Sequence, residues 1–103
     1  MNNDVFSLNE LVLLRLFYDK SIDNQFIALS IDEIHSILTQ TGNSLCVPTV
    51  RRIINKLLSN GYLLLGVKKR IKTRSFYISD KGKDVIDEMI RISQTMQEVN
   101  INE

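Results

Sequence analysis

The pattern Ser-x-x-Glu occurs twice in the first third of the chain, and each copy directly precedes a run of apolar residues with helical spacing. Ser7 and Glu10 form the first pair, and Ser30 and Glu33 form the second. In such a capping box the serine and the glutamate each accept a hydrogen bond from the other's backbone N–H. The two pairs therefore fix two helix starts. They predict one helix over residues 8–19 and another over residues 31–40.

Pro48 and the pair Asn60-Gly61 bound a third helical segment. Proline fits the first turn of a helix, and asparagine and glycine tolerate the left-handed conformation that follows a last turn. We therefore predict a third helix over residues 48–59. Two β-prone runs follow, separated by a hydrophilic stretch, and they predict a hairpin over residues 62–79.

A final amphipathic helix is predicted over residues 81–97, because apolar residues recur there at heptad spacing. The apolar run 26–29 fits either a short edge strand or a packed approach to the second helix. The 103 residues, 44% of them hydrophobic, can form one domain with one core, which we place over residues 1–103. The predicted class is α+β, mainly α, in the order helix, helix, helix, hairpin, helix.

Charge is distributed unevenly along the chain. No acidic residue occurs between Glu33 and Asp80, and this stretch contains eight of the thirteen basic residues. The other segments carry all twelve acidic residues, so the formal net charge of +1 conceals a positive middle and negative flanks. A field of one sign attracts and steers a polyanion. The pattern favours nucleic acid as a partner, and an ordinary solvated basic face is the alternative.

The third predicted helix has an apolar face and a polar face. Its apolar residues must point into the core, which turns its polar residues outward. Arginine can bridge guanine O6 and N7, asparagine can bridge adenine N6 and N7, and a hydroxyl near the positive end of the helix dipole can hold a phosphate. We predict base contacts by Arg51, Arg52 and Asn55, and further DNA contacts by Thr49 and Lys56.

The connection between the two β-prone runs is strongly basic. We predict that it binds DNA through five cations, namely Lys68, Lys69, Arg70, Lys72 and Arg74. Guanidinium is less strongly hydrated than ammonium, so Arg70 is the candidate for insertion into a narrow minor groove. The lysines are expected to contact phosphates, which set affinity and register.

The element order is that of a winged helix-turn-helix domain. Two stretches, Asn60-Gly61-Tyr62-Leu63 and Phe76-Tyr77-Ile78-Ser79-Asp80-Lys81-Gly82, resemble the wing of the MarR- and PadR-like bacterial regulators. Those regulators commonly show a Gly-aromatic-apolar start and a Tyr-x-Leu/Ile-Ser/Thr-x-x-Gly end. The resemblance implies a dimer that binds double-stranded DNA, and repression of transcription is the commonest use of the scaffold. The chain is also similar in size and layout to the small centromere-binding adaptors of tubulin-like plasmid and phage partition systems, which implies a filament-forming GTPase as partner.

The first and last predicted helices carry more large apolar side chains than a three-helix core is expected to bury. We predict that they pack two copies of the chain together as a homodimer, which would place two recognition helices on successive half-sites of a palindrome. The alternative is that the last helix folds back onto its own domain. The predicted dimer contacts are Leu13, Leu16, Phe17, Val85, Met89, Ile92 and Met96.

Several functional classes are not expected. The sequence has no glycine loop for phosphate and no serine or cysteine with a partner base, so we do not expect an enzyme. One cysteine and one histidine cannot form a metal site without further ligands, so neither metal nor cofactor is expected. No apolar run reaches the roughly 18 residues of a membrane helix and no signal peptide is recognised, so the expected location is the cytoplasm. Three roles stay open: a repressor, a partition adaptor, and a winged-helix module that binds an acidic protein.

Overall fold

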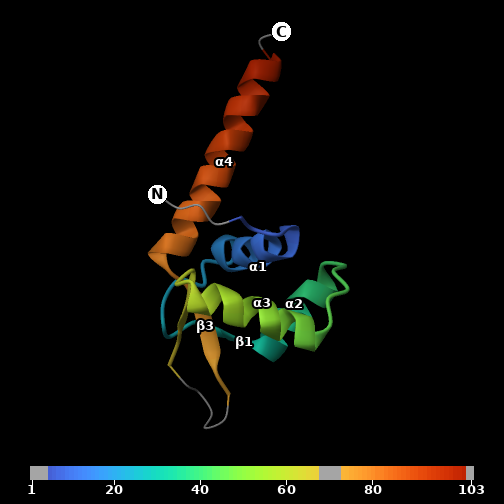
Figure 1. The fold of residues 1–103 in the computed structure, drawn as a ribbon, viewed down its shortest axis with the longest axis vertical. Helices are drawn as coiled ribbons and strands as arrows, with labels where there is room; N and C mark the ends of the chain where they lie inside the picture. Colours follow the sequence, from blue (N-terminus) through green and yellow to red (C-terminus); the bar gives the residue numbers. More distant parts are fainter. Residues whose placement is uncertain (1–4, 68–72, 102–103) are drawn as a thin grey trace.

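The computed structural model describes residues 5–67 and 73–101, with side chains described up to residue 95. Within these ranges the chain forms four helices and three short strands (Figure 1). Their bounds are α1 (Leu8–Asp19), β1 (Leu29–Ser30), α2 (Ile31–Gln40), α3 (Val47–Ser59), β2 (Leu63–Leu65), β3 (Ser75–Ile78) and α4 (Asp80–Ile101). The order of elements is the predicted one, with the strand β1 added between α1 and α2.

Both predicted capping boxes are present. The Ser7 Oγ accepts a hydrogen bond from the Glu10 N–H at 3.2 Å, and the Glu10 carboxylate accepts one from the Ser7 N–H at 2.9 Å. Ser30 and Glu33 form the same reciprocal pair at 3.2 and 3.0 Å. Because these caps fix where the backbone becomes helical, α1 and α2 have the bounds predicted from the sequence.

The other two helices differ slightly from the prediction. α3 starts at Val47, one residue early, with Pro48 in its first turn. After its last residue, Gly61 takes a φ of 81°, a conformation that glycine adopts easily and other residues do not. α4 starts one residue early and extends past residue 97 to Ile101. No glycine or proline follows position 82, so the sequence contains no breaker that would end the helix at residue 97.

The strands form one antiparallel sheet with the order β1-β3-β2. β3 is central, and its Phe76 pairs with Leu29 of β1 on one side and with Leu65 of β2 on the other. The ambiguous run 26–29 is a strand only at its last residue, and the three residues before Leu29 are irregular, beginning with a turn at Phe26. The predicted hairpin is present, with strands of three and four residues inside the predicted span 62–79.

The described buried residues form one hydrophobic cluster that joins α1, α2, α3 and the start of α4 to the sheet. Each fully buried aliphatic or aromatic side chain contributes about 1.5–3 kcal/mol to folding. The members of this cluster are Leu13, Leu14, Phe17, Ile34, Leu38, Val50, Ile53, Ile54, Leu57, Tyr62, Leu63, Phe76, Ile78 and Ile86. Four of them come from α3, so one face of α3 is fixed against the core and the opposite face is left outside.

The molecule is elongated, with principal extents of 56 × 31 × 23 Å. Figure 1 shows α4 leaving the body toward one end of the long axis, while β3 lies toward the other end. α1 lies between α4 and α3. The outer face of α3 and the projecting part of α4 are therefore separate surfaces, available for different contacts.

Candidate nucleic-acid interface

The outer face of α3 carries two unpaired arginines. Arg51 and Arg52 are exposed, and Asn55, which lies on the same side one turn later, is half-buried. No ion pair between described residues involves Arg51 or Arg52. Their side chains point away from the core because the neighbouring positions Val50 and Ile53 are buried. Both guanidinium groups are therefore free to bind an external anion or a base edge.

The N-terminus of α3 differs from those of α1 and α2. Its N-cap residue, Cys46, makes no side-chain capping bond, and no acidic residue lies in the first turn. The Cys46 Sγ instead lies 3.2 Å from the Thr49 Oγ1. Hydrogen bonds to the Thr49 side chain and backbone lower the pKa of the exposed Cys46 thiol. The partial positive charge at this helix end is not offset by an acidic side chain, and it adds to the field of Arg51 and Arg52.

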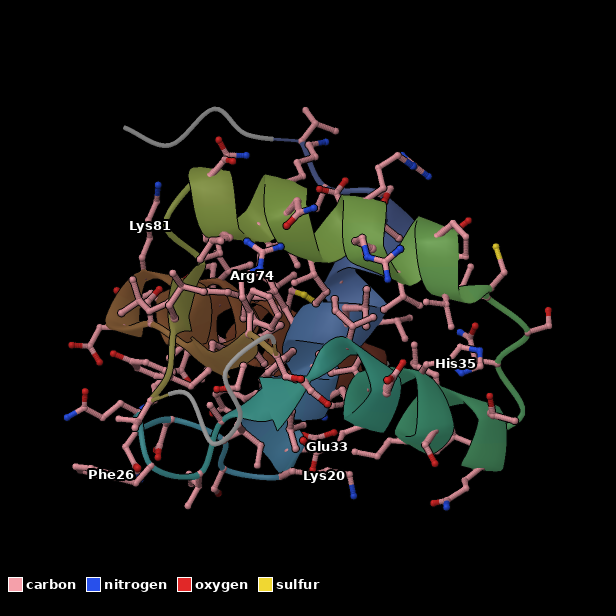
Figure 2. All side chains as sticks on the ribbon, turned by 90° about the horizontal axis from the view of Figure 1, so that it is seen from below. Lys20, Phe26, Glu33, His35, Arg74 and Lys81 are labelled. Atoms are coloured by element: carbon pink, nitrogen blue, oxygen red, sulfur yellow. The ribbon has the colours of Figure 1, made fainter. Side chains whose placement is uncertain are left out.

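Arg74 connects the wing to α3. It directly precedes β3, and its Nη2 donates a hydrogen bond to the Asn55 Oδ1 at 2.9 Å. Its guanidinium also lies over the ring of Phe76, 5.4 Å from the centroid. Figure 2 shows the Arg74 side chain beside α3, well separated from Phe26 and His35 at the edges of this view. The structure thus brings together Arg74 and Asn55, two predicted DNA contacts that are 19 positions apart in the sequence.

Lys56 has a partner that sequence reasoning missed. Its Nζ lies 3.2 Å from the Glu10 Oε2, and the Glu10 carboxylate also accepts the hydrogen bond from the Ser7 N–H. Glu10 is only 5% exposed. Burial raises the pKa of this carboxyl, but the hydrogen bonds with Ser7 and Lys56 outweigh burial and hold the pKa below its ordinary value of 4.5. Lys56 lies at the outer surface with its charge partly neutralised by Glu10, and its DNA contact stays a prediction.

The ion pair between Lys56 and Glu10 predicts a stability change at acid pH. Because the folded-state pKa of Glu10 is lowered, its contribution is present above the ordinary pKa and is lost as the pH falls below 4.5 through the folded pKa. We expect Glu10→Gln to lower the unfolding free energy by about 1–3 kcal/mol at pH 7 and by much less at pH 3. Urea denaturation at both pH values measures this difference.

The matched control is Glu33→Gln, because Glu33 has the same capping role on α2 and is exposed. It is expected to change stability by a few tenths of a kcal/mol. Equal losses for the two variants at pH 7, or a loss for Glu10→Gln that is the same at both pH values, would show that the ion pair with Lys56 does not stabilise the fold.

Four predicted DNA contacts, Lys68, Lys69, Arg70 and Lys72, lie outside the described residues and stay predictions. The residues on either side of this stretch are held in place. The Gly66 N–H donates to the Ser75 carbonyl at 2.9 Å. The Val67 N–H donates to the Gln25 carbonyl, also at 2.9 Å.

The predicted dimer contacts divide into two groups. Leu13 and Phe17 are fully buried in the core of their own chain, so their assignment to a dimer surface was wrong. α1 carries apolar residues on two sides, and their spacing alone did not show which side faces the core. Leu16, Val85 and Met89 are half-buried, and Ile92 is 47% exposed. The side chain of Met96 lies outside the described part of the chain.

An apolar groove runs between α1 and α4. One part, of about 580 Å³, is lined by Phe6, Leu11, Val85, Met89 and Ile92 together with charged residues of α4. A second part, of about 330 Å³, shares Leu11 and Met89 and adds residues of α1 together with Leu38 and Thr41 at the end of α2. The predicted dimer contacts did not include Phe6, Leu8, Leu11 and Val12. Leu8, Val12 and Leu16 recur every four residues, but so do Leu13 and Phe17, so spacing did not separate this stripe from the core positions.

The start of α4 is attached to the end of α3. The Lys81 Nζ donates to the carbonyl of Asn60, the C-cap of α3, at 2.7 Å and lies 4.4 Å from the centroid of the Tyr62 ring. Further along α4, Lys83 pairs with Asp23 at 3.2 Å. These contacts join the first turn of α4 to the end of α3 and to the segment that follows α1. Sequence reasoning did not assign any of them.

Two negative findings apply to the described residues. They contain no group of three histidine, cysteine, aspartate or glutamate side chains placed to hold a metal ion. None of the helices they form is both long enough and apolar enough to cross a lipid bilayer.

The arrangement of three helices, a hairpin packed on the third helix and a further long helix defines the winged-helix class of folds. No protein-family model matches the sequence, and a search of curated proteins gives no significant match. Solved structures match in fold. The ferric uptake regulator of Francisella tularensis, solved with iron, has a TM-score of 0.62 at 20% identity over 78% of this chain and 57% of its own.

MepR of Staphylococcus aureus, solved in complex with DNA, has a TM-score of 0.70 at 14% identity over 92% of this chain and 70% of its own. SSV1 F-93 has a TM-score of 0.61 at 13% identity over 95% of this chain and 99% of its own. At these identities the similarity establishes the fold. The predicted winged helix-turn-helix architecture and the resemblance to MarR-like regulators at the level of fold are therefore confirmed.

Proposed function

We propose that the chain binds double-stranded DNA through α3 and the adjacent wing. The observation that carries the proposal is the pair of exposed arginines, Arg51 and Arg52, on a helix whose N-terminus has no acidic first turn. Among the described basic residues of α3 and the wing, only Lys56 forms an ion pair with an acidic residue, Glu10. A phosphate backbone is the partner that matches such a surface.

The chemistry of the surface favours DNA over an acidic protein. Arg51 and Arg52 can each form bidentate bonds with a guanine, and Asn55 offers an amide to an adenine. α3 has thirteen residues and one polar face, and an α-helix of this kind fits the major groove, which is about 12 Å wide. MepR, which has the same fold, has been solved in complex with DNA. Phosphate contacts by the basic wing would fix the register in which α3 meets the bases.

We propose further that two copies act together as a homodimer. The groove between α1 and α4 exposes apolar side chains, with Leu8 at 77% and Ile92 at 47% exposure. Residues 91–95 of α4 are all exposed, and a projecting helix without tertiary contacts is only marginally stable in water. Packing of α4 from a second copy into the groove would stabilise both helices. Such a dimer would present two α3 helices to half-sites about 34 Å apart.

The biological role that we propose is that of a transcriptional repressor, since a dimer that occupies a palindrome blocks access to the DNA beneath it. A partition adaptor would use the same surface differently, by coating repeated sites and recruiting a filament-forming GTPase. The two roles predict different patterns of occupied DNA, so one experiment distinguishes them.

The test is footprinting of the purified chain on the DNA that flanks its own gene, over a series of salt concentrations. We expect protection that weakens steeply as salt rises, because binding releases counterions from the phosphates. A short protected palindrome supports the repressor, whereas an extended footprint over repeats supports the partition role. Binding that is absent or insensitive to salt, on flanking DNA and on unrelated duplexes, overturns DNA binding and leaves an acidic protein as the partner.

A further inference from the structure

Arg74 differs from Arg51 and Arg52, the other exposed arginines of the candidate interface, because its side chain contacts both α3 and the sheet. Its Nη2 donates to the Asn55 Oδ1 at 2.9 Å, and its guanidinium lies 5.4 Å from the centroid of the Phe76 ring. Phe76 is fully buried on the central strand of the sheet. The arginine therefore extends from a fixed platform to the middle of the recognition helix.

The hydrogen bond determines which way the Asn55 amide points. A guanidinium has only donors, so the atom that faces it must be the amide oxygen. The opposite orientation would place the amide NH₂ against the guanidinium, donor against donor. The Asn55 Nδ2 is therefore directed away from Arg74, and both atoms of the amide have defined positions before any ligand binds.

A fixed amide matters for reading a base. Asparagine recognises adenine by accepting from N6 and donating to N7, so it needs the oxygen and the nitrogen in one defined order. The Asn55 Oδ1 has a second lone pair and can accept from adenine while it still accepts from Arg74. An amide that rotates freely would also fit bases with the reverse pattern of donors and acceptors.

We infer that Arg74 is a positioning residue, which sets the base preference of Asn55 by holding its amide in one orientation. The inference rests on the proposed DNA binding. It names Arg74 and Asn55 as the pair of residues that would recognise one base of the site. It also assigns Arg74 a role different from that of an ordinary phosphate contact. A phosphate contact needs the positive charge, whereas the positioning role needs the planar guanidinium that stacks on Phe76 and reaches Asn55.

The test uses selection of preferred sites from a random pool of DNA duplexes with the full chain and with Arg74→Lys, which keeps the charge. We expect the wild-type chain to select an adenine at one position of each half-site, and Asn55→Ala to lose that preference. Arg74→Lys is expected to lose preference at the same position, by roughly 5- to 150-fold, with an unchanged dependence of binding on salt. The double variant is expected to lose no more than Asn55→Ala alone.

The matched control is Arg91→Lys, because Arg91 is exposed on α4 and pairs there with Glu88. It should select the wild-type sequence. The inference is overturned if Arg74→Lys keeps the wild-type preference, if it weakens binding to all sequences equally, or if the wild-type chain binds DNA without selecting any sequence. Those outcomes leave DNA binding in place. Failure of the proposed function itself is distinct, since the wild-type chain would then show no salt-dependent binding to any duplex.

Discussion

Replacing Arg51 and Arg52 together by alanine is expected to lower the affinity for the preferred DNA by about 2–6 kcal/mol, because each bidentate arginine contact contributes about 1–3 kcal/mol. The slope of log affinity against log salt is expected to change little, because the two side chains are assigned to bases and the phosphate contacts remain. Both side chains are exposed, so the variant should keep its fold. Fluorescence anisotropy with a labelled duplex, at several salt concentrations, measures affinity and slope together.

The control is the double variant Lys20→Ala and Arg91→Ala, which makes the same change in net charge elsewhere. Lys20 is exposed just after α1, and Arg91 pairs with Glu88 on α4. We expect this control to bind DNA with nearly the wild-type affinity. If both double variants lose affinity equally, the interaction depends on total charge and α3 has no special role.

Local patterns in the sequence were sufficient to predict the helices. The capping boxes at Ser7 and Ser30 involve residues three positions apart, and such short-range chemistry is independent of the rest of the fold. For the same reason Pro48 and Gly61 bracketed α3 to within one residue. The polar face of α3 followed from the spacing of its apolar residues, and the structure exposes Arg51 and Arg52 as expected.

Contacts between distant positions were not accessible in this way. Glu10 and Lys56 are 46 positions apart, and each also has an adequate local explanation, as a capping residue and as an exposed helix residue. Arg74 and Asn55 meet only because β3 packs beside α3. Periodicity reports which residues share a helix face, but it does not report what covers that face.

α1 has two apolar faces with different surroundings. Leu13 and Phe17 are fully buried inside the chain, whereas Leu8, Val12 and Leu16 line the groove toward α4. A residue of the first kind should affect folding, and a residue of the second kind should affect association. Ile92 of α4 lies in the groove with 47% of its surface exposed. A substitution there tests association, whereas a substitution of the buried Phe17 tests folding.

Phe17→Ala is therefore expected to lower the unfolding free energy by about 3–5 kcal/mol, through the lost burial and the cavity that remains. That loss is a large part of the total for a domain whose stability is about 5–15 kcal/mol. Ile92→Asp is expected to shift the chain from dimer to monomer, because it places a charge in the apolar interface, and to keep the core folded while helix is lost only from the projecting part of α4. Urea denaturation followed by circular dichroism and sedimentation velocity at micromolar concentration measure the two effects.

Each variant serves as the control for the other, since both remove one large apolar side chain from the same pair of helices. A Phe17→Ala chain that keeps its stability but sediments as a monomer would restore Phe17 to the dimer interface and contradict its place in the core. An Ile92→Asp chain with wild-type sedimentation would show that the groove between α1 and α4 is not where two copies meet. A wild-type chain that sediments as a monomer at this concentration would remove the homodimer, and with it the expected spacing of paired half-sites on DNA.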